Sequence, residues 1–211
     1  MARLTPAERE KQIVAGAIGF FAQRGLAGQL RDLAKEIGVT HTLLYHYFPT
    51  KQALIERVYS ELVDARWKPE WETLLDDRKL DIEEKFVRFY SDYMVSVLTH
   101  DFVRIIIFSG LTDRSIVDKF FAKLKQELLP RLIRETRRFH GMTSRAKPSA
   151  RETELLLGLH GGLFYMGVRR FIYGQVMHNA EDPKFDPIYL RDRIRSYLLS
   201  WAQVMRPVIS K

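Results

Sequence analysis

The chain has 211 residues, of which 46% are hydrophobic and 28% charged, so it can bury a core and still remain in solution. Lys and Arg total 34 against 26 Asp and Glu, and the resulting charge of +8 suits a polyanionic partner without identifying one. The absence of cysteine excludes disulfides, thiolate metal sites and a cysteine nucleophile, and it agrees with the cytoplasmic location that we expect.

Apolar residues recur at helical spacing along almost the whole chain, and no run of strand alternation interrupts them, so we predict an all-α fold. The first helix is predicted over Pro6–Arg24, with Thr5 as its N-cap, Pro6 at its first position and Gly25 as its stop. Its predicted buried stripe consists of Ile13, Ala17, Phe20 and Phe21.

Two short helices are predicted next, over Leu30–Ile37 and His41–Tyr47. Pro49 blocks continuation of the second, and Thr50 caps a longer helix that we expect to reach about Trp71. The buried positions of this longer helix are predicted to be Leu54, Ile55, Val58 and Leu62.

Beyond Trp71 the predicted helices are longer and richer in aromatic residues. They are Asp81–Leu98, Asp101–Leu111, Ser115–Phe139, Ser149–Tyr173 and Pro187–Met205, with polar loops at 141–149 and 178–187. The uncharged stretch Leu155–Val168 is shorter than the ~20 residues that a membrane span needs, so we expect no membrane partner.

The segment LRDLAKEIGVTHTLLYHYFPTK, residues 30–51, predicts two short helices joined by a tight turn. Ala34 is small where the helices approach, Gly38 can take a positive φ at the turn, and Thr40 caps the second helix. The outward face of that second helix then carries His41, Thr42, Leu43, Tyr45, His46 and Tyr47. A structural helix pair seldom exposes two tyrosines and two histidines together.

The same segment, extended to LAKEIGVTHTLLYHYFPTKQAL, resembles the DNA-binding signature of the TetR (tetracycline repressor) family of transcriptional regulators. FFAQRG at 20–25 is similar to the end of that family's first helix, and the resemblance covers roughly the first 60 residues. The matching positions are Leu33, Ala34, Gly38, Val39, Leu44, Tyr45, Tyr47, Phe48, Pro49, Lys51 and Leu54.

This resemblance implies a three-helix helix-turn-helix head in residues 1–50 and a helical ligand-binding and dimerisation body in residues 51–211. It also implies a repressor that is released from a palindromic operator by a small, largely apolar effector. The residues that it assigns to double-stranded DNA are Arg31, Thr40, His41, Thr42, Leu43, Tyr45, His46, Tyr47 and Lys51.

The sequence departs from the family pattern at two places. Gln29 stands where the family has Thr or Ser before the scaffold helix, so we expect Gly28 to act as a weaker cap. Leu43 stands where Thr is common, and its side chain can only pack or touch a thymine methyl group.

The body carries two further sets of candidate residues. Aromatic and Met residues of the middle helices form the predicted ligand pocket: Phe86, Phe89, Tyr90, Tyr93, Met94, Phe102, Phe108, Phe120 and Phe121. Small and apolar residues of the last two helices form the predicted homodimer interface: Leu155, Gly158, Leu159, Gly162, Met166, Leu198, Trp201 and Met205.

No catalytic or cofactor motif is found, and no histidine pair has metal-ligand spacing, so we expect neither an enzyme nor a cofactor or metal site. A helical enzyme or lipid carrier with a helix-turn-helix-like head is the alternative. A basic segment in residues 131–151 contains one acidic residue, Glu135. We interpret this segment as a solvated face, and the alternative is an anion-binding surface. Its basic residues are Arg131, Arg134, Arg137, Arg138, Arg145, Lys147 and Arg151.

Overall fold

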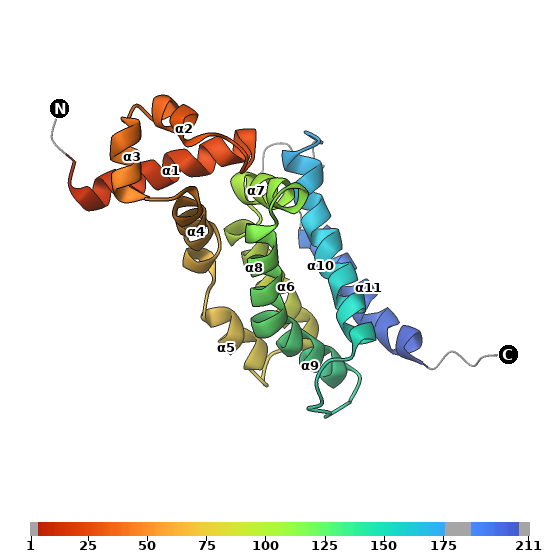
Figure 1. Ribbon diagram of the computed structural model, residues 1–211. Helices are drawn as coiled ribbons and strands as arrows, with labels where there is room; N and C mark the ends of the chain where they lie inside the picture. Colours follow the sequence, from red (N-terminus) through yellow and green to blue (C-terminus); the bar gives the residue numbers. More distant parts are fainter. Residues whose placement is uncertain (1–3, 176–186, 207–211) are drawn as a thin grey trace. The chain divides into compact units, whose positions relative to one another are not determined.

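The computed structural model describes residues 4–175 and 187–206, and the described residues form helices without strands (Figure 1). The chain divides into two compact units that alternate along the sequence. Unit 1 comprises residues 1–67 and 99–120, and unit 2 comprises residues 68–98 and 121–211. The all-α fold predicted from the sequence is confirmed.

Unit 1 contains the helix-turn-helix. Its elements are α1 (Pro6–Arg24), α2 (Leu30–Glu36), α3 (His41–Tyr47), α4 (Lys51–Leu62), a 3₁₀ turn η1 (Asp64–Arg66), α7 (His100–Leu111) and most of α8 (Ser115–Lys123). The predicted head boundary at residue 50 concerns function and stays a prediction; the compact unit itself extends beyond that residue.

The ends of α1 form as predicted. Thr5 and Glu8 make a reciprocal capping box, in which the Glu8 N–H donates to Thr5 Oγ1 at 3.3 Å and the Thr5 N–H donates to Glu8 Oε2 at 2.7 Å. Pro6 occupies the first turn, and the helix ends at Gly25 with a φ of 77°. Such a φ strains any residue with a Cβ, so glycine is the residue that allows this stop.

The apolar face of α1 is the core of unit 1. Ile13, Ala17, Phe20 and Phe21 are all buried, as predicted, and α1 packs against α2, α4 and α7. Arg104 of α7 donates through Nε to the Ala22 carbonyl near the end of α1. The main-chain groups of this helix end are therefore satisfied from α7 as well as by α1 itself.

The turn before α2 differs from the expectation that Gly28 caps this helix. The N-cap is Gln29, and it makes no side-chain capping hydrogen bond. Gly28 instead lies against the ring of Phe20, where a Cβ would come within 2.5 Å of Cε1. Glycine is required at this position by steric contact, and the start of α2 lacks the capping hydrogen bond.

The helix expected from Thr50 to about Trp71 is shorter than predicted. Thr50 caps α4 by accepting from the Ala53 N–H at 3.0 Å, but α4 ends at Leu62 and η1 follows. Pro69 removes a donor and disfavours helical φ/ψ at the residue before it, which explains why no continuous helix reaches Trp71. That tryptophan belongs to a separate short helix, α5 (Glu70–Asp76).

Unit 2 contains α5, α6 (Ile82–Ser96), the end of α8, η2 (Leu124–Leu128), α9 (Leu129–Phe139), α10 (Ala150–Phe171) and α11 (Pro187–Met205). Within it, α6 packs against α5, α9 and α11, while α10 packs against α9 and α11. The predicted loop at 178–187 lies, except for Pro187, outside the described residues. No single described helix has the length and apolar composition to cross a membrane; α6 and α7 do so only when counted together.

The single helix predicted over Ser115–Phe139 is confirmed as one continuous helical stretch, but its middle turn is π-helical. A π-helical turn, η2, separates α8 from α9, and the Leu129 N–H donates to the Leu124 carbonyl five residues back. Pro130 cannot donate, and its ring crowds the carbonyl four residues earlier. The wider turn accommodates this proline without ending the helix.

The core of unit 2 combines aromatic packing with one buried ion pair. Phe86, Phe89 and Tyr90 of α6 are fully buried. Beside them, Lys85 Nζ donates to Glu135 Oε2 at 2.6 Å and to the Leu75 carbonyl at 3.1 Å. Both charged side chains are at most 1% exposed, so removing one partner would leave an uncompensated buried charge.

The contact between Gly28 and Phe20 leads to a stability prediction. Gly28→Ala forces a Cβ against a ring that is 1% exposed, so the free energy of unfolding should fall by about 1–3 kcal/mol. Gly110→Ala in α7 is the matched control, because a Cβ there meets no atom within 4 Å and should raise stability by about 0.4–1 kcal/mol. Urea unfolding followed by circular dichroism measures both; equal effects of the two variants would contradict the steric explanation.

Candidate functional site

The helix pair α2–α3 is built around a turn at Gly38. Gly38 has a φ of 69°, and the Val39 N–H donates to the Ala34 carbonyl at 2.9 Å, which reverses the chain directly after α2. Leu33 and Leu44 are fully buried and hold the two helices together. The geometry is that of a helix-turn-helix, in which the second helix is presented on the surface.

The start of α3 is fixed by Thr40, whose Oγ1 accepts from the Leu43 N–H at 3.1 Å. The hydroxyl thus satisfies one of the free N–H groups of the first turn. Leu43, which departs from the family pattern, is half-buried. Its side chain is therefore partly engaged in packing.

The outer face of α3 consists of polar and aromatic side chains. His41, Thr42, Tyr45 and His46 are exposed, while Tyr47 is half-buried. Tyr45 is 41% exposed and stacks edge-on against His41 at 4.7 Å between ring centroids, so it is not a core aromatic. Among the described residues, none of these five side chains has a hydrogen-bond partner, which leaves their donors and acceptors open to a ligand.

Two basic residues flank this face. Arg31 of α2 is exposed and has no ion pair among the described residues. Lys51 is the first residue of α4, whose first turn contains no acidic residue. Partial burial lowers the pKa of the Lys51 ammonium, and the carboxylate of Asp113 opposes this shift. A cation at the positive end of a helix is unfavourable by itself, so its placement suits an anion bound at the same point.

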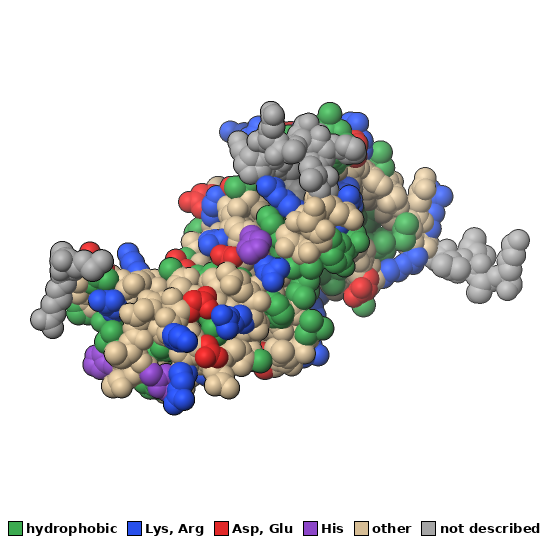
Figure 2. Space-filling model, turned by 90° about the horizontal axis from the view of Figure 1, so that it is seen from above, with side chains coloured by type: hydrophobic (Ala, Val, Ile, Leu, Met, Phe, Trp, Pro, Cys, Tyr) green, Lys and Arg blue, Asp and Glu red, His purple; other side chains and the backbone are tan. Residues whose placement is uncertain are grey.

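Charge alone would not have located this face. The first 60 residues contain eight basic and five acidic side chains, and on the face shown in Figure 2 Lys and Arg lie among Asp, Glu and apolar residues. The surface thus lacks one continuous basic patch in that view. The polar helix α3 is the more specific feature.

Comparison with known proteins agrees with this geometry. Residues 13–58 match the profile of the family described as bacterial regulatory proteins, tetR family. The chain therefore matches the TetR family in its helix-turn-helix region. It is 27% identical over 110 residues to the HTH-type transcriptional repressor KstR2 of Mycolicibacterium smegmatis, and this match covers 52% of each chain. It is 34% identical over 62 residues to the HTH-type transcriptional regulator LuxR of Vibrio harveyi, covering 29% of this chain and 30% of that protein.

These curated relatives are matched over about half of their length or less, whereas solved structures of TetR-type regulators superimpose on nearly the whole of this chain. A TetR-like regulator from Rhodococcus sp. RHA1 superimposes with a TM-score of 0.68 at 16% identity, covering 95% of this chain and 99% of that one. The fatty acid degradation regulator FadR from Bacillus halodurans gives 0.63 at 17% identity, covering 94% and 97%. At these identities the likeness concerns the fold.

The nine predicted pocket residues do not all lie in one unit. Phe86, Phe89, Tyr90, Tyr93 and Met94 are buried in α6 of unit 2. Phe102, Phe108 and Phe120 belong to unit 1, where Phe102 contacts Phe120 edge-on and Phe108 packs against Gly25. Phe121 begins the second stretch of unit 2 and is 39% exposed. A role in ligand binding stays a prediction for each of them.

Sequence analysis did not assign His160 of α10 to any site, although this histidine interrupts the longest apolar stretch. Its ring is buried beside the α6 aromatics, and Tyr93 Oη lies 3.3 Å from its Nε2. Burial lowers the pKa of the His160 imidazole to about 4 and raises the pKa of the Tyr93 hydroxyl. The signal in the sequence that could have indicated this site was a polar residue inside an otherwise apolar helix.

The predicted dimer-interface residues fall into two groups. Leu159, Met166, Leu198 and Trp201 are buried within unit 2 itself. Gly158 is exposed, and Leu155, Gly162 and Met205 are half-buried. Gly158 and Leu155 line a groove of about 770 Å³ between α10 and α11. A role at a dimer interface remains a prediction, and the four buried residues also pack inside the protomer.

The basic segment is better neutralised than its sequence indicates. Glu135 was the only acidic residue expected to oppose it, but Arg131 pairs with Glu72 at 2.5 Å and with Asp76, which also binds Arg134. Arg137 donates from Nε to Glu152 at 2.6 Å, and these hydrogen bonds lower the pKa of the Glu152 carboxyl to about 2.

The rest of the segment is partly unpaired. Arg138 binds Glu135 at 2.7 Å, and Arg151 donates to the Val204 carbonyl. Arg145 and Lys147 are exposed and without an ion pair among the described residues. Most of the segment's charge is therefore used within unit 2, and anion binding by the remainder stays a prediction.

Proposed function

We propose that this chain is a sequence-specific DNA-binding transcriptional regulator that binds a palindromic operator as a homodimer and is released by a small, largely apolar effector. One observation carries the proposal: α3 presents open polar side chains from a fixed helix-turn-helix in a TetR-family chain. Repression is supported by the kind of relative that the chain resembles.

The type of each residue on and beside α3 indicates whether it would contact a base or a phosphate. The side chains of α3 are suited to base edges in the major groove, with Thr42, His46 and Tyr45 as the open polar groups. Arg31 and Lys51 flank them and are suited to phosphates, which position a protein on the duplex without reading its sequence. Lys51 also adds its charge to the free N–H groups at the start of α4.

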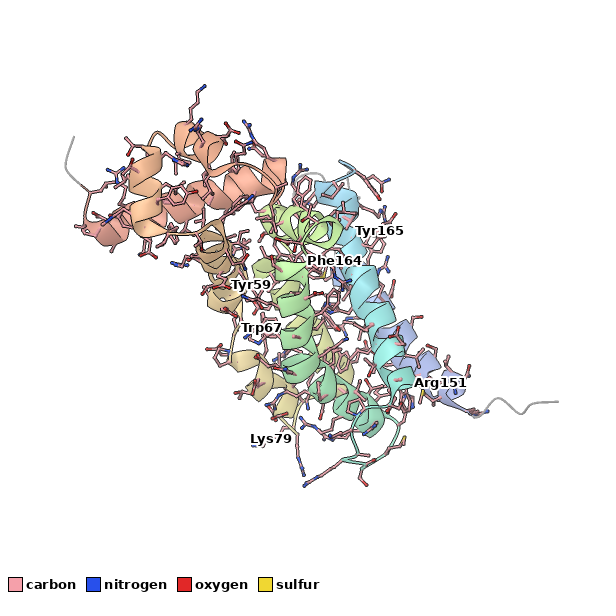
Figure 3. All side chains as sticks on the ribbon, viewed as in Figure 1. Tyr59, Trp67, Lys79, Arg151, Phe164 and Tyr165 are labelled. Atoms are coloured by element: carbon pink, nitrogen blue, oxygen red, sulfur yellow. The ribbon has the colours of Figure 1, made fainter. Side chains whose placement is uncertain are left out.

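Dimerisation is proposed because α3 has seven residues and contacts few base pairs, so a palindrome read by two copies supplies the specificity. The exposed surface of α10 and α11 supports this use. Tyr165, labelled in Figure 3, is 51% exposed on α10, while Ile188 and Leu199 of α11 are 65% and 60% exposed. Exposed apolar side chains on two helices that pack together favour association with another protein surface.

The effector is assigned to the aromatic interior of unit 2. Trp71, Phe89 and Tyr93 contact one another edge-on or tilted, with ring centroids 5.6–5.7 Å apart. Two of these rings belong to α6, which ends at Ser96, and the chain then runs through Val97 and Leu98 to Thr99, the N-cap of α7. Because α7 packs on α1, a change in α6 has a covalent route to the helix that supports α3.

Salt dependence distinguishes a DNA-binding regulator from a helical enzyme or lipid carrier. Lys51→Ala should weaken binding to operator and to unrelated duplex alike and reduce the slope of log K against log salt by about one unit per lost phosphate contact. Lys79→Ala, which removes the same charge from an exposed site in unit 2 (Figure 3), should leave the slope unchanged. Fluorescence anisotropy over a salt series measures this, and binding to no duplex at all would reject the regulator.

Binding as a homodimer predicts both the mass of the protein in solution and the spacing of the DNA half-sites that it protects. Sedimentation at micromolar concentration should give twice the mass of the 24.8 kDa chain. The protected DNA should be a pseudo-palindrome with half-sites about 10 bp apart, or a multiple of that distance. Leu199→Glu should shift the protein towards monomer, while Leu111→Glu, at a 77% exposed residue of α7, serves as the control. A wild-type monomer that binds DNA specifically would contradict this prediction.

Release by an effector is tested by comparing how the effector changes operator affinity with how the operator changes effector affinity. A compound that lowers operator affinity by a given factor must itself bind more weakly by the same factor when operator is present. We expect a factor of about 5–150, which corresponds to the ~1–3 kcal/mol usual for such coupling. Calorimetric titration with and without operator DNA measures the two affinities. Equal affinities would remove the sensor role and leave a DNA-binding protein without this switch.

A further inference from the structure

Three polar side chains meet in the interior of unit 2, where α6 faces α10. Tyr90 and Tyr93 are 0% and 1% exposed, and His160 is 5% exposed. The imidazole centroid lies 5.3 Å from the Tyr93 ring and 6.1 Å from the Tyr90 ring. These three side chains, named here the polar cluster, are otherwise bordered by the aromatic residues of α5 and α6.

Two atoms of the polar cluster have no hydrogen-bond partner in the described protein. They are the Tyr90 hydroxyl and His160 Nδ1, while His160 Nε2 is 3.3 Å from Tyr93 Oη. Leaving a buried polar group unpaired is destabilising, and two such atoms in adjacent side chains are unusual in a folded protein. Trp201 Nε1 is also unpaired, but it lies apart, on a ring stacked with His140.

Neighbouring buried groups in the same unit are paired. Tyr197 Oη lies 3.2 Å from Thr136 Oγ1, Trp71 Nε1 donates to Asp92 at 2.7 Å, and Lys85 donates to Glu135. The fold thus satisfies these other polar groups of unit 2 and leaves one atom unpaired on each of two neighbouring side chains, Tyr90 of α6 and His160 of α10. This contrast is what points to a ligand group.

We propose that Tyr90 and His160 form the polar contact of the effector site and that the effector is an apolar ring compound bearing one uncharged oxygen, a hydroxyl or a ketone. The Tyr90 hydroxyl donates to this oxygen, and His160 Nδ1 makes the second hydrogen bond. The inference rests on the proposed function, because it names the chemical class of the molecule to which the sensor responds.

The surroundings favour a neutral oxygen over a carboxylate. Lys85, which is fully buried in this unit, already binds Glu135 and the Leu75 carbonyl, so its charge is compensated by a carboxylate of the protein itself. Because burial lowers the imidazole pKa of His160 to about 4, the ring is neutral at pH 7 and offers one donor and one acceptor. An anion here would be desolvated without a counter-charge, which is strongly unfavourable.

The first test uses the free protein. Tyr90→Phe removes an unpaired buried hydroxyl, so the Tm should rise, on the order of 2–4 °C. Tyr197→Phe is the matched control, because its hydroxyl is already paired with Thr136 and its removal should lower the Tm. A Tm for Tyr90→Phe that falls as far as that of Tyr197→Phe would overturn the inference, since the hydroxyl would then be bonded without a ligand.

The second test uses three probes with one ring skeleton: naphthalene, 2-naphthol and 2-naphthoate. The wild-type protein should bind 2-naphthol about fivefold or more tightly than either of the others, as expected for one or two added hydrogen bonds. In Tyr90→Phe this preference should shrink while naphthalene affinity holds. Preference for 2-naphthoate, equal binding of naphthalene and 2-naphthol, or binding of none of the three would each overturn the proposal.

The ligand class and the proposed regulatory function can be rejected independently of each other. Operator binding is measured on its own through the salt series. Preference for 2-naphthol in a protein that binds no duplex would keep the ligand class and reject the regulator. Specific operator binding without that preference would reject the ligand class alone.

Discussion

The apolar face of α1 is the surface on which unit 1 is assembled. α2, α4 and α7 all pack on this helix, and α3 is positioned through its contact with α2. Gly25, whose φ is 77°, ends α1 and lets the chain turn back. The helices that follow can then cover the apolar face of α1. The orientation of α3 therefore depends on the packing of α1 and α2 as well as on the sequence of α3 itself.

Unit 2 contains two groups of buried polar side chains, one with most of its hydrogen bonds made and one with few. The Lys85–Glu135 pair is supported by a carbonyl and by Arg138, so that few of its hydrogen-bonding positions are left open. The polar cluster of Tyr90, Tyr93 and His160 has a single internal contact and keeps two atoms unpaired. The two arrangements differ in how completely their hydrogen-bonding groups are used within the protein.

The sequence predicts the features that depend on residues three or four positions apart. The caps at Thr5, Thr40 and Thr50 and the turn at Gly38 were predicted because donor and acceptor are neighbours in the chain. The surface exposure of most of α3 follows from the same local period.

Features that join distant segments could not be predicted in this way. The partners of Arg131 come from α5, and the contact of Gly28 with Phe20 depends on how the chain folds back after α1. His160 was visible as an interruption of an apolar stretch, but only the fold shows that it meets Tyr93. The same limitation of local sequence patterns explains why the nine predicted pocket residues, eight aromatic and one Met, divide between the two units.

The chain passes between the two units three times, at 67/68, 98/99 and 120/121, so the helix-turn-helix is not a detachable N-terminal module. A chimera that joined residues 1–67 to a foreign body would lose Arg104 from the Ala22 carbonyl and Phe108 from Gly25. Recombination that exchanges DNA specificity would have to carry residues 99–120 with it. Under the proposed function, point substitution within α3 would avoid this restriction and would be the simpler route to a new DNA specificity.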